Sequence, residues 1–126
     1  MTTTRRRPVP IYTSAGDVEA YMVYPMLYNL GGDWVGFVTP NRDVYSVLGH
    51  YVGWLSDDPR ILRKKSYDYD KPKLKPPNKP GKFTAPASAP LAPLMPDLSF
   101  DTLDILMDEP DRLHGLDSGD FKPDLD

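Results

Sequence analysis

Apolar and polar positions repeat three times along the first half of the chain. The segments 11–22, 27–38 and 44–55 each begin with an aliphatic residue and a tyrosine, and reach a glycine four positions after the tyrosine. Each segment then ends with a small, an aromatic and an aliphatic residue. The arm after the glycine is rich in β-branched and aromatic residues, which favour strands. The repeat therefore predicts three β-hairpins.

Glycine and proline positions favour hairpins over helices in this region. A tight turn between two strands needs a positive φ, which glycine adopts without strain. The repeated glycine supplies that residue in every copy, as Gly16, Gly32 and Gly49. Prolines at positions 25, 40 and 59 fall between the units, where strands end. A helix with this many glycines and prolines would be poorly stable.

Two columns of equivalent positions assign the faces of the predicted strands. One column is small in every copy: Ala20, Gly36 and Gly53. Small residues at equivalent positions indicate that backbones approach closely there, as at the hub of a radial arrangement. The next column is aromatic: Tyr21, Phe37 and Trp54. We expect these rings to pack outward or between hairpins, where they are candidates for contacts with a partner, although core packing explains them equally well.

A single hairpin is marginally stable in water, so the units must bury one another's faces. A degenerate fourth unit is expected to begin at residues 60–63 and to end near Tyr69. The repeated Tyr-x3-Gly pattern, together with the stretch 49–55, resembles the bacterial 4-fold beta flower domain. This resemblance covers residues 9–70 and implies an all-β fold of three to four hairpins about a pseudo-fourfold axis. The family has no established function, so it implies no catalytic or binding residue.

Charge and proline content change sharply after residue 60. Residues 60–82 carry nine basic and two acidic side chains, residues 72–96 contain eight prolines, and residues 97–126 carry ten acidic and two basic side chains. Such blocks rarely bury enough apolar area to offset the entropy of ordering. We therefore expect four parts: a basic arm (1–8), the hairpin domain (9–70), an extended Lys/Pro-rich linker (71–96) and an acidic tail (97–126).

The acidic tail contains a short amphipathic motif. Its apolar residues have near-helical spacing, and the anchors we expect are Phe100, Leu103, Leu106 and Met107. This pattern is typical of a peptide that docks in a groove of another protein. Upstream, Pro90–Pro93 and Pro93–Pro96 match a bare PxxP, a weak pattern in a polyproline II tract. The alternatives are a tail that only solubilises, or one that folds back onto the lysines.

Few side chains suggest catalysis. The chain has no cysteine, which excludes disulfides and cysteine-ligated metals, and no nucleotide-binding loop or nucleophile motif is present. Asp17, Asp33 and His50 share one column and could converge on a metal, but ordinary polar turn residues explain them better. We therefore expect no enzyme activity, no cofactor and no metal, and we expect a scaffold or accessory subunit that binds other proteins.

Nucleic-acid binding is the alternative function. The residues that would contact phosphates are Arg5, Arg6, Arg7, Lys64, Lys65, Lys71, Lys73 and Lys75. The net charge of −3 and the acidic tail oppose this interpretation. The basic start of the chain is followed by no hydrophobic segment, and no apolar run is long enough to span a bilayer. We therefore expect a soluble, cytoplasmic protein.

Overall fold

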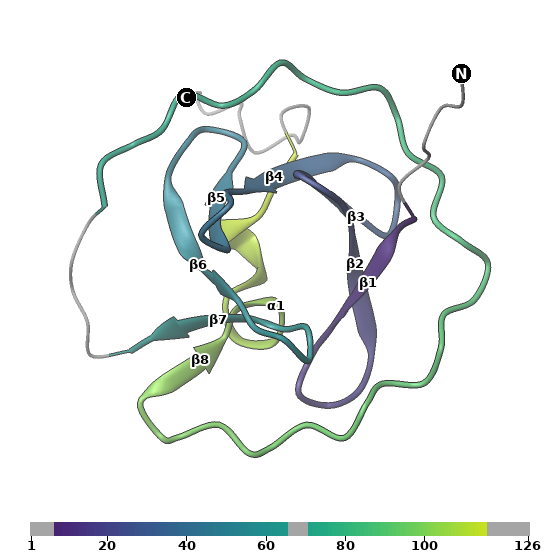
Figure 1. Cartoon of the computed structure of the whole chain (residues 1–126), viewed down its shortest axis with the longest axis vertical. Coiled ribbons are helices and arrows are strands. Elements are labelled where there is room, and N and C mark those ends of the chain that lie inside the picture. Colours follow the sequence, from purple (N-terminus) through teal and green to yellow (C-terminus); the bar gives the residue numbers. More distant parts are fainter. Residues whose placement is uncertain (1–6, 66–70, 116–126) are drawn as a thin grey trace.

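A computed structural model describes residues 7–65 and 71–115. These residues form one antiparallel sheet in which eight strands follow the order of the chain and curl around a central axis (Figure 1). The strands are β1 (Val9–Tyr12), β2 (Val18–Val23), β3 (Met26–Asn29), β4 (Trp34–Val38), β5 (Asp43–Ser46), β6 (Tyr51–Leu55), β7 (Ile61–Lys64) and β8 (Thr102–Asp104). A short helix α1 (Ile105–Asp108) and a 3-10 turn η1 (Pro110–Arg112) follow β8. The predicted all-β class is confirmed.

The three repeats form the hairpins β1–β2, β3–β4 and β5–β6. Their turn glycines have the predicted positive φ, of +92° at Gly16, +88° at Gly32 and +87° at Gly49. In each turn the glycine amide donates a hydrogen bond to the carbonyl three residues earlier, as from Gly49 to Ser46 at 2.9 Å. The turn chemistry is therefore common to the three hairpins, as the repeat indicates.

Each hairpin also carries a register irregularity at the same place, between the repeated aliphatic residue and its tyrosine. In the second hairpin Tyr28 pairs with Trp34 and Leu27 pairs with Gly36, so Val35 is the extra residue. Strict alternation along the strand would place Val35 on the same face as Phe37. The bulge instead brings Val35 into the core together with Val38.

The small column lies where neighbouring backbones meet, as predicted. A Cβ on Gly53 would lie 2.1 Å from the carbonyl oxygen of Leu62. A Cβ on Gly36 would lie 2.4 Å from the carbonyl oxygen of Tyr45 and 2.9 Å from a methyl group of Leu113. All three distances are shorter than a real van der Waals contact, so these positions require glycine.

The fourth hairpin is built from two distant segments. β7 begins at the predicted position, but its partner is β8, with Leu62 opposite Asp104. Beyond β8, Ile105 is fully buried and Leu113 nearly so, and both belong to the main core. The predicted boundary at residue 70 and the separate acidic tail are therefore wrong for residues 102–113. The overall charge of the tail concealed these core residues, and β7 would otherwise expose an unpaired edge.

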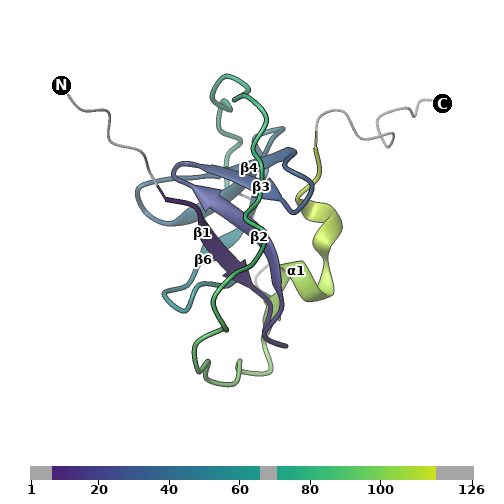
Figure 2. The same cartoon turned by 90° about the vertical axis from the view of Figure 1, so that its right-hand side faces the viewer.

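Residues 71–99, which we call the strap, wrap around the outside of the sheet (Figures 1 and 2). They contain no helix or strand, as expected, but they lie on the domain instead of reaching away from it. The strap meets the hairpins in reverse order, from the third to the first. Its anchors are hydrogen bonds from the Leu74 amide to Gly49 O (3.0 Å), from the Phe83 amide to Gly32 O (3.3 Å), from the Tyr12 hydroxyl to Pro90 O (2.7 Å) and from Arg60 to Pro96 O (3.1 Å).

Candidate functional site

The tips of two hairpins are docking points for the strap. A Cβ on Gly32 would lie 1.9 Å from the carbonyl oxygen of Phe83, and a Cβ on Gly49 would lie 2.1 Å from that of Leu74. These glycines are thus needed for the turn and also for the approach of the strap. At Gly16 no described atom beyond its chain neighbours comes within 4 Å of the Cβ position. The strap therefore uses two of the three equivalent tips in this way.

An aromatic contact holds the middle of the strap. The ring of Phe83 stacks on Tyr28 with centroids 4.7 Å apart, and lies 5.9 Å from the ring of Tyr21. Phe37 stacks on Tyr45 at 5.5 Å. Tyr21 and Phe37 are buried, and Trp54 is half-buried. Two of the three aromatic residues predicted as candidate partner contacts, Tyr21 and Phe37, therefore pack inside this protein. Tyr21 lies against the protein's own strap.

A polar cluster with two buried members, Arg60 and Asp104, joins the end of the strap to the first and last hairpins. Arg60 is 3% exposed and pairs with Asp58 at 2.7 Å, and it also donates to Ser14 Oγ at 2.9 Å. Ser14 in turn donates to the carboxylate of Asp104 from its amide (2.6 Å) and from its hydroxyl (2.7 Å). Because Asp104 belongs to β8, the cluster connects the first hairpin with the last strand.

The neighbours of Asp58 in this cluster change the pKa of its carboxyl group. Burial alone would raise the pKa, but hydrogen bonds from Arg60 and Ser56, together with the charge of Arg60, outweigh burial and hold the pKa below its ordinary value. Asp58 is therefore ionised at neutral pH. Its carboxylate keeps the guanidinium of Arg60 oriented toward the strap.

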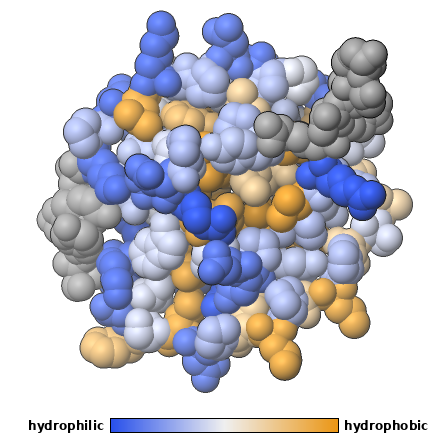
Figure 3. All heavy atoms as spheres, viewed as in Figure 1, coloured by the Kyte–Doolittle hydropathy of each residue, from blue (hydrophilic) through white to orange (hydrophobic). Residues whose placement is uncertain are grey.

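Between its last two anchors, the strap exposes large apolar side chains. Leu91 and Leu94 are 95% and 101% exposed, and Phe100, just after the strap, is 89% exposed. Figure 3 shows hydrophobic side chains protruding among hydrophilic ones along the lower edge, where the strap runs in Figure 1. We call Leu91, Leu94 and Phe100 the apolar ridge. Three large apolar side chains exposed within ten residues of the chain make this segment a candidate interaction surface.

The predicted tail anchors divide between this surface and the core. Phe100 and Met107 are exposed, Leu103 is half-buried in β8, and Leu106 packs against the main core. The near-helical spacing produced only the four-residue helix α1, because the preceding residues pair with β7. Leu91 and Leu94 were missed as anchors. The signal that could have found them was the leucine after the first proline of each of the two PxxP matches.

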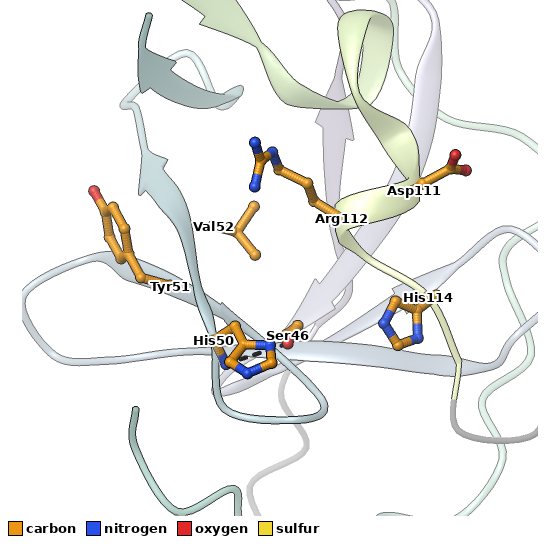
Figure 4. Close-up of a pocket in the computed structure, with 7 residues that line it drawn as sticks. All are labelled: Ser46, His50, Tyr51, Val52, Asp111, Arg112 and His114. Atoms are coloured by element: carbon orange, nitrogen blue, oxygen red, sulfur yellow. Dashed lines mark hydrogen bonds between the residues drawn. The ribbon is translucent and has the colours of Figure 1, made fainter. Parts of the chain in front are cut away.

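A polar pocket of about 150 Å³ lies between the β5–β6 turn and the segment after α1 (Figure 4). His50 and Ser46 line one side, and Arg112 and His114 line the other, while the carboxylate of Asp111 is directed away. The side chains offer N–H and O–H donors suited to water or a small anion. No three His, Cys, Asp or Glu side chains of the described segments are grouped to hold a metal ion. Asp17, Asp33 and His50 lie at separate hairpin tips.

The basic residues of the nucleic-acid alternative are partly paired within the protein. Lys64 lies 3.3 Å from Asp101, and Lys71 lies 3.0 Å from Asp43 and 5.0 Å from the ring centre of Tyr51. The exposed members are Arg7, Lys64, Lys65, Lys73 and Lys75, while Arg5 and Arg6 lie outside the described residues. Nucleic-acid binding stays a prediction.

Comparison with known proteins places the chain in a family without adding an activity. The family model described as "4-fold beta flower protein" matches residues 9–107, which extends past the strap and β8 to α1. No curated protein and no solved structure gave a significant match. Among the described helices, none is long and apolar enough to cross a membrane.

Proposed function

Because this chain belongs to the 4-fold beta flower family, for which the match brings no activity, we propose its function from the surface that it exposes. We infer that it is a non-enzymatic protein-binding module, a scaffold or accessory subunit of a larger assembly. The observation that supports this proposal is the near-complete exposure of the apolar ridge. Each such side chain contributes about 1.5–3 kcal/mol when it moves from water into an apolar surrounding.

The anchors of the strap make the ridge more suitable for binding. Leu91 and Leu94 lie between two anchored carbonyls, that of Pro90, which accepts from the Tyr12 hydroxyl, and that of Pro96, which accepts from Arg60. A flexible linker would lose conformational entropy on binding, whereas this segment is already ordered along the domain. The acidic tail was expected to dock through Phe100, Leu103, Leu106 and Met107. We propose instead that Phe100 acts together with the leucines of the strap.

Site-specific photo-crosslinking in cells tests this function. A photoreactive residue at position 94 of the full chain should capture a defined protein, and one at the exposed position of Lys75 should not capture it. The triple variant Leu91→Ser, Leu94→Ser, Phe100→Ser should lose capture from a probe at the neighbouring Ser99. The matched control is Leu48→Ser, which removes an exposed leucine at a hairpin tip and should leave capture intact.

The folding of every variant is checked by circular dichroism before capture is compared. The purified partner should then bind the full chain at least tenfold more tightly than it binds the triple variant, since three apolar side chains are lost. Equal affinity for the two proteins, or no capture above that at Lys75, would overturn the proposal.

A further inference from the structure

Burial along the last part of the strap repeats every third residue. Ala89, Ala92, Met95 and Leu98 are half-buried, and the two residues between each of them and the next are exposed. Polyproline II has three residues per turn, so a segment in this conformation that rests on a surface buries every third side chain. The anchored carbonyls of Pro90 and Pro96 are six residues apart, which is two turns. The strap from 89 to 98 therefore has the burial period of a polyproline II helix that rests on the domain.

Two of the three faces of this helix are turned to solvent. One face carries the prolines at 90, 93 and 96, and the other carries Leu91, Leu94 and Asp97. Successive residues of a face are about 9 Å apart, from a rise of about 3.1 Å per residue. The exposed surface is thus a repeated Pro-Leu pair that ends in an acidic side chain.

We propose that residues 90–97 are a preformed polyproline II ligand for a partner domain whose groove is lined by aromatic side chains. Grooves of this kind accept pairs of proline and apolar residues, and they gain from a ligand that is already extended. Asp97 lies on the same face as the leucines, so a basic side chain at one end of the groove would set the direction of binding. This inference rests on the proposed function and names the class of its partner.

The domain itself contributes to recognition. The hydrogen bond from Tyr12 (2.7 Å) and the one from Arg60 (3.1 Å) hold the helix at both ends, and the Ala and Met face rests against the sheet. A free peptide of the same sequence is not held in this way, so it must lose conformational entropy when it binds. The full chain should therefore bind a suitable groove more tightly than the peptide does.

A panel of purified SH3, WW and EVH1 domains provides the probes, since each type binds polyproline II ligands through an aromatic groove. Titration of a panel domain into the ¹⁵N-labelled full chain should shift amide signals within residues 88–100. Leu94→Ser and Pro93→Ala should each weaken that binding about tenfold, the factor for one lost buried apolar side chain. Leu48→Ser should leave the affinity unchanged, and a synthetic peptide of residues 88–99 should bind more weakly than the full chain.

Absence of binding across the panel would overturn the inference, as would binding that is unaffected by Leu94→Ser. These outcomes are separable from the test of the proposed function. A protein captured at position 94 that depends on the apolar ridge but has no aromatic groove would support the proposed function and refute the polyproline II partner. A panel domain that binds the full chain with the expected losses would support both.

Discussion

Alanine substitutions at two hairpin tips separate the cost of a turn from the cost of losing the strap. Gly16 and Gly49 have nearly the same backbone, with φ of +92° and +87°. Forcing an alanine into this conformation costs about 1–2 kcal/mol at either tip. Around Gly16 the space is open, but a methyl group on Gly49 would overlap the carbonyl oxygen of Leu74 at 2.1 Å. Only Gly49→Ala should therefore move the strap.

The extra cost at Gly49 can be worked out from the contacts there. Displacing the strap breaks the hydrogen bond from the Leu74 amide to Gly49 O (3.0 Å), which contributes about 0.5–1.5 kcal/mol. Gly49→Ala should therefore lower the free energy of unfolding by about 1.5–3.5 kcal/mol, and Gly16→Ala by about 1–2 kcal/mol.

Urea denaturation of the full chain measures both values, and hydrogen exchange of the Leu74 amide reports on the strap directly. We expect faster exchange of this amide in Gly49→Ala while exchange in the core strands follows global stability. Gly16→Ala is the control and should leave the Leu74 amide as protected as in the unchanged protein, after correction for stability. Equal destabilisation by the two substitutions, with equal exchange at Leu74, would refute the docking of the strap on the tip.

Three further predictions follow from the buried contacts. A chain that ends at Ser99 loses β8 and the core side chains of Ile105 and Leu113. Because each buried core side chain contributes about 2–5 kcal/mol, this shortened chain should give the circular dichroism spectrum of an unfolded protein. A native spectrum would show that residues 1–99 fold alone. The lowered pKa of Asp58 stabilises the fold above about pH 4, and this contribution is lost as the pH falls further. Asp58→Ala should therefore lower the free energy of unfolding by about 3 kcal/mol at pH 7. Measured from pH 7 downward by urea denaturation, this variant should lose less stability than the unchanged protein. Burial and, to a lesser extent, Tyr21 raise the pKa of Tyr12, so the stability that Tyr12 contributes is complete below about pH 10 and is lost above it. Tyr12→Phe should lower the free energy of unfolding by about 1 kcal/mol at pH 7 and should reduce the loss of stability at alkaline pH. An equal loss of stability above about pH 10 in the two proteins would contradict this.

The repeat in the sequence was sufficient for the fold of the first three hairpins. The tyrosine, the turn glycine and the small residue each report a local requirement, namely a strand, a positive φ and a close backbone approach. The bulge was not predictable from strict alternation, because one extra residue moves Val35 to the opposite face without changing the pattern of residue types.

The fourth hairpin and the strap could not be read from composition. The pairing of β7 with β8 joins segments about 40 residues apart, and neither has the tyrosine and glycine of the other hairpins. The prolines predicted an extended segment, but its path depends on single contacts such as those of Phe83 with Tyr28 and Gly32. Of the three residues of the apolar ridge, only Phe100 was named from the sequence as an anchor for a partner, and that role stays a prediction.

The link between Ser14 and Asp104 spans 90 positions of the chain. During synthesis, the first three hairpins leave the ribosome long before β8, the last strand of the sheet. Until residue 104 arrives, the edge of β7 is open to pairing with another molecule. Closure of so large a loop is slow compared with forming a hairpin, so we expect the pairing of β8 with β7 to follow the formation of the first three hairpins.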